Sequence, residues 1–189
     1  MSLSTYLLYL AAVALLVLSP GPTMLMCMTS SLQHGPRKAL AAAAGSVTAV
    51  LGTMLLSALG LGALLAASET AFWVLKAAGA AYLIWLGIKT FCSRATVFDE
   101  LPEQDGKAAK ALATVPAHKL FVQGLIVGGS NPKAILFFTA FFPQFLDPAA
   151  AWAPQFAVLA STFVAFEFTV LTLCALGVAR LAPVLRSGT

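Results

Sequence analysis

The sequence predicts an all-α polytopic membrane protein with five apparent transmembrane helices, arranged as a 3+3-like inverted repeat with the sixth helix missing. Hydrophobic residues make up 60% of the 189 residues and charged residues only 10%, whereas a soluble domain carries about 25% charge. Five apolar runs reach the roughly 20 residues that a helix needs to cross a bilayer. Two of these runs are interrupted at similar positions, which is the third observation.

The first apolar run covers residues 6–28 and is interrupted by Ser19-Pro20-Gly21-Pro22. Each proline lacks a backbone donor and displaces the carbonyl four residues before it, so regular helix is disfavoured there. This interruption is a candidate point of ligand contact, and a structural kink without ligand contact is the alternative interpretation. No basic residue precedes the run, which therefore reads as a retained span and not as a cleaved signal peptide.

The second and third runs cover residues 39–67 and 71–91. The second is rich in Ala and Gly, and small residues let neighbouring helix backbones approach closely. In the third, Lys76 lies about two turns from the start, where its amine can snorkel to the outer headgroups. A long polar segment, residues 93–118, follows and is expected to form a loop.

The fourth run, residues 120–142, is interrupted at its middle by Gly128-Gly129-Ser130-Asn131-Pro132-Lys133. Backbone groups freed by the proline must be satisfied by protein or by a watery cavity, because lipid offers no partner. An amine such as Lys133 at this depth marks a functional site by default. The alternative is a proline kink stapled by Asn131, with Lys133 paired to a buried acid.

The fifth run covers residues 156–179 and carries Glu167 at its middle. An acid at that depth costs roughly 2.5–3.5 kcal/mol on insertion scales, so a function is expected for it. Glu167 is predicted to take up and release protons; a fixed ion pair with Lys133 or Lys76 is the alternative. No sixth apolar run follows.

Basic residues predict the orientation of the chain. Nine of the 11 lie in the turn after the first run, in the long loop with its flanks and in the tail. Cytoplasmic loops carry such an excess, so the N-terminus is expected outside, and the long loop and C-terminus in the cytoplasm. Three spans before the loop make the two interrupted helices antiparallel, as in an inverted repeat. The predicted parts are a first repeat (1–92), the cytoplasmic loop (93–118) and a second repeat (119–189).

Matched interruptions in two halves are the best sequence pointer to the binding site of a secondary transporter. Carbonyls freed at the breaks can accept an ammonium group, and half-helix N-termini favour a carboxylate. With Lys133 and the Asn131 amide, these groups suit an amino acid. The predicted substrate-binding residues are Ser19, Pro20, Gly21, Pro22, Gly129, Asn131, Pro132 and Lys133.

Several short motifs extend across nearly the whole chain. They are Ser19-Pro20-Gly21-Pro22, His34-Gly35-Pro36-Arg37, Gly79-Ala80-Ala81-Tyr82-Leu83 with Leu86-Gly87, and Asn131-Pro132-Lys133 with Phe142-Pro143-Gln144-Phe145. In these motifs the sequence resembles the LysE superfamily of bacterial exporters, in particular its RhtB branch for homoserine, threonine and leucine efflux. The resemblance implies a multi-pass carrier of the bacterial inner (plasma) membrane that exports amino acids using the proton-motive force. Family members usually have a sixth helix after the segment that is 180–186 here.

Other functional classes find less support in the sequence. An intramembrane hydrolase would need a motif such as HExxH or GxSxG, so the protein is not expected to be an enzyme. A thiol or redox protein would need paired cysteines, whereas Cys27, Cys92 and Cys174 lie in or at the ends of different runs. A metal-cation exporter would need more ligands in the spans than Glu167. No cofactor and no nucleic acid is expected. The predicted partners are a neutral amino acid, a proton and the lipid bilayer. The exact cargo and the oligomeric state, a homo-oligomer included, stay open.

Overall fold

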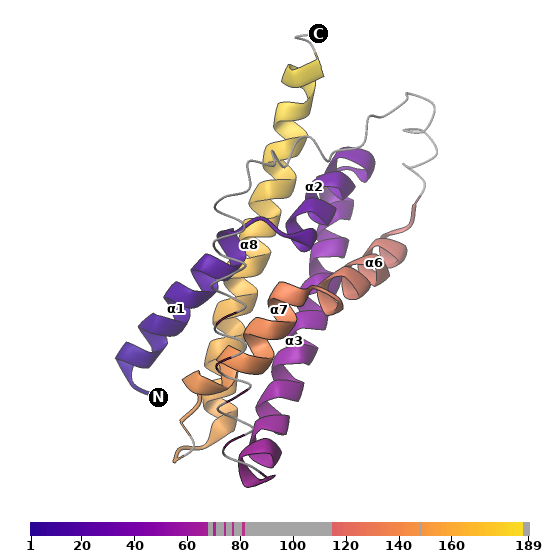
Figure 1. Ribbon diagram of the computed structural model, residues 1–189. Coiled ribbons are helices and arrows are strands. Elements are labelled where there is room, and N and C mark those ends of the chain that lie inside the picture. Colours follow the sequence, from indigo (N-terminus) through magenta and orange to yellow (C-terminus); the bar gives the residue numbers. More distant parts are fainter. Residues whose placement is uncertain are drawn as a thin grey trace. The chain divides into compact units, whose positions relative to one another are not determined.

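The computed structural model describes residues 1–67, 70, 74, 77, 81, 115–147 and 149–186. All regular structure in this part of the chain is helical, which confirms the predicted class (Figure 1). The elements are α1 (Leu3–Leu18), α2 (Pro22–His34), α3 (Pro36–Ala67), α6 (Ala117–Gly129), α7 (Pro132–Leu136), the π-helix η1 (Phe137–Phe141), the 3₁₀-helix η2 (Phe142–Phe145) and α8 (Trp152–Arg186). The predicted third span, apart from residues 74, 77 and 81, and the loop as far as residue 114 lie outside the described residues.

Two described helices are long and apolar enough to cross a membrane alone: α3 over Pro36–Gly60 and α8 over Trp152–Leu181. The pairs α1 with α2, and α6 with the segment Pro132–Phe145, pass the same test only when each pair counts as one interrupted span. The described residues therefore hold two to four candidate spans. The predicted interruptions are present in both runs, while the count of five stays a prediction.

The chain divides into two compact units. The first comprises Met1–Ser19, Val50–Ser93 and Asn131–Phe166, and the second comprises Pro20–Ala49, Arg94–Ser130 and Glu167–Thr189. The chain passes from one unit to the other at both interruptions. Each unit also contains segments from both predicted repeats, so the two compact units do not coincide with the two predicted repeats. The inverted repeat itself stays a prediction.

An aromatic core holds the first unit together around Tyr9. Its fully buried ring packs edge-on against Phe142 and Phe145, with centroids 6.2 and 5.1 Å away, and its hydroxyl donates to the Leu159 carbonyl oxygen at 2.9 Å. A buried tyrosine usually finds such a partner for its hydroxyl. These contacts join α1 to η2 and to the first half of α8.

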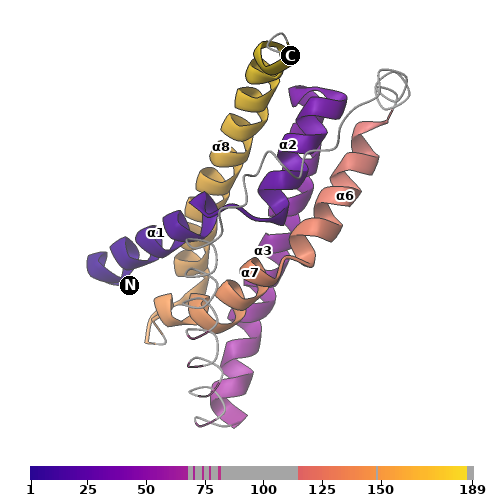
Figure 2. The same ribbon diagram turned by 45° about the horizontal axis from the view of Figure 1, so that its top comes forward.

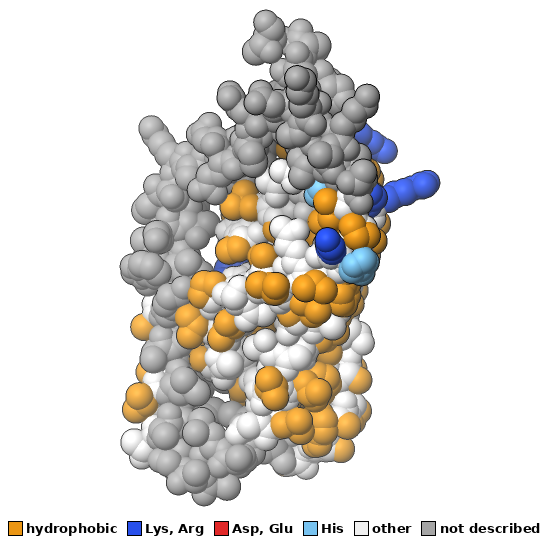
Figure 3. Space-filling view, turned by 90° about the vertical axis from the view of Figure 1, so that its right-hand side faces the viewer, with side chains coloured by type: hydrophobic (Ala, Val, Ile, Leu, Met, Phe, Trp, Pro, Cys, Tyr) orange, Lys and Arg blue, Asp and Glu red, His pale blue; other side chains and the backbone are white. Residues whose placement is uncertain are grey.

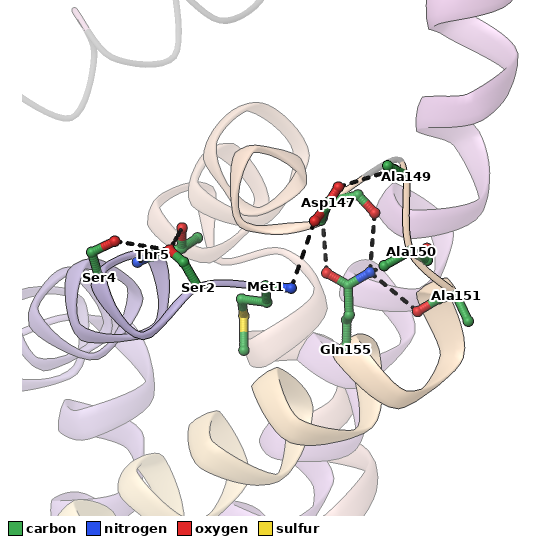
Figure 4. Close-up of polar contacts among 9 residues, drawn as sticks. All are labelled: Met1, Ser2, Ser4, Thr5, Asp147, Ala149, Ala150, Ala151 and Gln155. Atoms are coloured by element: carbon green, nitrogen blue, oxygen red, sulfur yellow. Dashed lines mark hydrogen bonds and ion pairs between the residues drawn. The ribbon is translucent and has the colours of Figure 1, made fainter.

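The turn before α8 is organised by the buried side chain of Gln155 (Figure 4). Its Oε1 accepts the Asp147 N–H at 2.9 Å, and its Nε2 donates to the carbonyl oxygens of Asp147 and Ala151 at 3.0 and 3.1 Å. The Asp147 carboxylate lies 3.7 Å from the amino group of Met1. One amide therefore satisfies the backbone of the turn, and the adjacent carboxylate ties the start of the chain to it.

Glycines set the packing of α3 against α6 in the second unit. A Cβ at Gly45 would lie 1.9 Å from the Phe121 carbonyl oxygen, and one at Gly124 would lie 2.0 Å from the Ala42 carbonyl oxygen. Neither clash can be relieved by moving a flexible side chain, because each involves backbone. Gly124 and Gly128 form a GxxxG spacing on α6, the small-residue pattern of closely packed membrane helices. The small residues predicted in the second run thus serve a close backbone approach.

The helix α2 is buried in the same unit through contacts with α6 and with the second half of α8 (Figure 2). The thiol of Cys27 donates to the Leu171 carbonyl oxygen at 3.5 Å, and the hydroxyl of Ser31 donates to the Ala175 carbonyl oxygen at 2.6 Å. Cys27 and Cys174 are both free thiols. The short polar side chains of Cys27 and Ser31 thus donate hydrogen bonds to carbonyl oxygens of α8, although the surrounding contact is apolar.

Candidate functional site

Two X-Pro steps produce the first break. The residue before a proline is pushed out of helical geometry into extended geometry. Ser19 precedes Pro20 with φ −73° and ψ 127°, and Gly21 precedes Pro22 with φ −158° and ψ 176°. Pro22 then takes the first position of α2, where its missing N–H is not needed. The sequence therefore ends one helix and starts the next within a few residues.

The second break follows the same logic with one proline. Ser130 ends α6, and both its N–H and its hydroxyl donate to the Ile126 carbonyl oxygen, at 2.9 and 2.7 Å. Asn131 is extended before Pro132, and its Oδ1 accepts the Lys133 N–H at 3.1 Å as the N-cap of α7. Asn131 is only 5% exposed. The cap by which Asn131 was expected to staple the proline kink is thus present.

The side chain of Lys133 reaches the end of α1 within the first unit. Its Nζ donates to the carbonyl oxygens of Leu16 and Ser19 at 2.5 and 2.7 Å, and to the Ser19 hydroxyl oxygen at 2.9 Å. The Ser19 hydroxyl in turn donates to the Leu16 carbonyl oxygen at 3.1 Å. The last carbonyls of a helix lack intrahelical partners and carry the negative end of its dipole. The ammonium therefore neutralises the end of α1.

Lys133 is poorly placed for its own helix. It belongs to the first turn of α7, where the positive end of the peptide dipoles disfavours a cation. Its stem carries the charge away to the opposite kind of helix end, on α1. Such a conflict between local preference and tertiary contact is expected at functional or strained sites.

The structure brings together only some of the predicted site residues. Ser19, Asn131, Pro132 and Lys133 belong to the first unit, and Ser19 and Lys133 are in contact. Pro20, Gly21, Pro22 and Gly129 belong to the second unit. The sequence prediction placed a ligand ammonium among the carbonyls freed around Ser19 and Gly129, and in the structure the Lys133 ammonium donates to the Ser19 carbonyl oxygen.

Gly128 was overlooked as a residue of structural importance. A Cβ at Gly128 would lie 2.6 Å from the Ser46 hydroxyl oxygen, whereas one at Gly129 would make an ordinary 3.6 Å contact with the Ala49 Cβ. The GxxxG spacing was the available signal. Of the two glycines before the break, packing therefore requires Gly128, which leaves Gly129 free for another role.

Glu167 lies in α8 in the second unit and is half-buried. Its role in proton transfer stays a prediction, with a fixed ion pair as the alternative, and Lys76 lies outside the described residues. No group of three or more metal-ligating side chains occurs in the described ranges.

Comparisons with known proteins converge on one family. The LysE type translocator family profile matches residues 14–189. The chain is 36% identical over 172 residues to a homoserine/homoserine lactone efflux protein of Salmonella typhimurium, covering 91% of this chain and 79% of the relative. It is 32% identical over 164 residues to a leucine efflux protein of Klebsiella pneumoniae, covering 86% and 74%. An uncharacterized membrane protein of Pseudomonas aeruginosa is 40% identical over 153 residues, covering 80% and 69%. No solved structure matches.

Proposed function

The chain belongs to the LysE family of translocators, and from this premise we propose that it is a secondary transporter exporting neutral amino acids or their derivatives. Its relatives include efflux proteins for homoserine and for leucine, as the resemblance to the RhtB branch predicted. These are a polar and an apolar amino acid that share the α-ammonium and the α-carboxylate. We therefore propose that the carrier recognises those two groups and tolerates different neutral side chains.

The observation that carries the proposal is the contact of Lys133 with the interrupted end of α1. Freed backbone in a membrane helix is tolerated only where it is buried in protein or lines a watery cavity. Here an ammonium and an N-cap amide, from Lys133 and Asn131, accompany freed carbonyls within one unit. The neutral amino acid is proposed to place its carboxylate at Lys133 and Asn131, and its ammonium among carbonyls at the break.

The remaining residues predicted at the breaks keep their proposed role in substrate binding. The glycines and prolines at the breaks have no side-chain donors or acceptors, so their contribution is to expose backbone groups; they are Pro20, Gly21, Pro22, Gly129 and Pro132. Transporter folds commonly bind their substrates with such unwound backbone. Prolines and glycines also keep the two interrupted helices from being rigid and straight. Alternating access requires helices that can move in this way.

We propose that export is driven by the proton-motive force and that Glu167 carries the proton. Glu167 is a half-buried carboxyl in α8. Acidic side chains within membrane spans commonly form proton relays in transporters. The neutral amino acid and the proton would then move in opposite directions through one carrier.

The proposed orientation has the N-terminus outside, the long loop in the cytoplasm and the C-terminus in the cytoplasm of a bacterial inner membrane. On the face drawn in Figure 3, most of the visible Lys, Arg and His side chains gather in one region, and the rest of the described surface shows hydrophobic side chains among backbone and other side chains. Arg37 and Lys38 lie in the first turn of α3, and Lys119 lies in the first turn of α6. Basic residues at these two helix starts support a cytoplasmic edge there, following the positive-inside rule.

The proposed function is tested with the purified chain in proteoliposomes loaded with labelled leucine, threonine or homoserine. An imposed proton gradient should accelerate release of at least one of these amino acids, and a protonophore should abolish the acceleration. Empty liposomes and a charged amino acid serve as controls. If no neutral amino acid is released faster than from empty liposomes, the proposed function is wrong.

A further inference from the structure

We propose that the end of α1 is a binding site for a small monovalent cation, and that this chain fills it with the tethered ammonium of Lys133. Three oxygens surround the Lys133 Nζ: the carbonyl oxygens of Leu16 and Ser19 and the Ser19 hydroxyl oxygen, at 2.5–2.9 Å. A lysine ammonium has three donors, and these three oxygens are among its acceptors. All of these atoms belong to the first unit.

The oxygens are arranged by α1 itself. The hydroxyl of Ser19 donates to the Leu16 carbonyl at 3.1 Å, which points the hydroxyl lone pairs toward the cation. The extended geometry that Pro20 imposes on Ser19 turns the Ser19 carbonyl out of the helical direction. Lys133 contributes none of these constraints. The acceptor set should therefore persist when the amine is removed.

The environment makes an empty acceptor set costly. Leu16 and Val17 are buried, with 8% and 6% of their surface exposed, whereas Leu15 and Leu18 are 75% and 58% exposed, so the end of α1 is buried on one side only. Unpaired buried carbonyls lose the hydrogen bonds that water would provide. The helix dipole adds negative potential at the same point. Removing the amine should thus leave a site that attracts a free cation.

Such a position is a known type of ion site. Half-helix C-termini and unwound carbonyls coordinate coupling cations in other secondary transporters. In the present chain the cation is covalently attached, so no free sodium ion is needed to neutralise the end of α1. The inference concerns this cation position alone and does not rest on which solute is exported.

The chemistry of the oxygens selects the replacement cation. Distances of about 2.7–2.9 Å are those of hydrogen bonds from a charged nitrogen to oxygen. Methylammonium keeps the three N–H donors of lysine and places its methyl group where the lysine stem ended. Tetramethylammonium has the same charge but no N–H donor. The first ion should fill the site left by Lys133→Ala, and the second should not.

The test measures the thermal unfolding midpoint of purified Lys133→Ala in detergent, with the cation varied at constant pH and ionic strength. Methylammonium chloride should raise the midpoint saturably, by roughly 2–4 °C, and tetramethylammonium chloride should not. The unsubstituted chain should respond to neither ion. Lys38→Ala is the matched control, because Lys38 also donates to a backbone carbonyl, that of Val115 at 3.1 Å, but at a helix start. Methylammonium should not stabilise this control.

An unchanged midpoint of Lys133→Ala in methylammonium overturns the inference, and so does an equal rise with tetramethylammonium. If Lys133→Ala is not recovered folded, the comparison is made with Lys133→Met, which keeps most of the stem volume and lacks the charge. Failure of both variants to gain stability or folded yield from methylammonium also overturns it. The readout is stability, so this outcome is independent of whether the chain exports amino acids.

Discussion

The Nζ of Lys133 lies 2.7 Å from the carbonyl oxygen of Ser19. A lysine just after the second interruption thus neutralises the end of α1, at the first interruption. The two residues are 114 positions apart in the sequence. Both breaks are produced by a residue held extended before a proline. The contact therefore links the two interruptions of the apolar runs.

Asn131 is predicted to have two separable roles, as the N-cap of α7 and as a ligand of the substrate. Replacing the cap by alanine should destabilise the protein by about 1 kcal/mol, since the Lys133 N–H loses its side-chain acceptor. Asn131→Ser should restore the cap but not the amide. Denaturation in detergent measures the first role and proteoliposome efflux the second. Full export by Asn131→Ser would show that the amide does not bind the substrate.

The crossing of α3 and α6 is predicted to tolerate no side chain at Gly45. Gly45→Ala should destabilise the protein by about 1–3 kcal/mol, because the added Cβ would overlap the Phe121 carbonyl oxygen. Gly52→Ala in the same helix is the matched control, since its Cβ would meet no described atom within 4 Å. It should stabilise the helix by roughly 0.5–1 kcal/mol. Equal thermal stability of the two variants would contradict the close crossing.

The interruptions and helical class could be predicted from the sequence because proline acts through local covalent geometry. Ser19, Gly21 and Asn131 each precede a proline, and all three are extended in the structure. Composition and run length likewise indicated α3 and α8. These signals need no knowledge of tertiary contacts.

Partners across the fold could not be predicted in the same way. Lys133 was expected to help hold a ligand carboxylate, which stays a prediction, and its hydrogen bonds to backbone carbonyls at the end of α1 were not foreseen. Backbone acceptors carry no sequence signature, so the choice depends on which helix end lies within reach of the stem. Gln155 was missed for the same reason, since it bonds mainly to the backbone of a turn.

The orientation of the chain is predicted from its charge asymmetry. Single cysteines at Ala109 and Ala150 in a background without Cys27, Cys92 and Cys174 should react with impermeant maleimide from opposite faces of the membrane. The residue at 109 lies in the predicted cytoplasmic loop, and 150 lies in the turn before α8. Labelling of both positions from the periplasm would contradict the antiparallel arrangement of the two interrupted spans.

Glu167 is predicted to couple proton movement to export. Glu167→Gln keeps the size and the polarity of the side chain but cannot cycle a proton. It should abolish gradient-driven net efflux while leaving exchange of labelled for unlabelled amino acid across the liposome membrane. Glu167→Asp, which keeps the carboxyl, is the control. An equal loss of exchange and net efflux in Glu167→Gln would show that the acid is structural or binds the amino acid directly.

The central claim, that Lys133 at the interrupted spans serves substrate transport, is tested most directly by the efflux rate of Lys133→Ala in proteoliposomes. A charged hydrogen bond contributes about 1.5–3 kcal/mol, so its loss should slow proton-driven efflux of a neutral amino acid roughly tenfold or more. The variant must be inserted in the membrane at the parental level for the comparison to hold. Efflux at the parental rate by correctly inserted Lys133→Ala would contradict the claim and leave both interruptions as structural kinks.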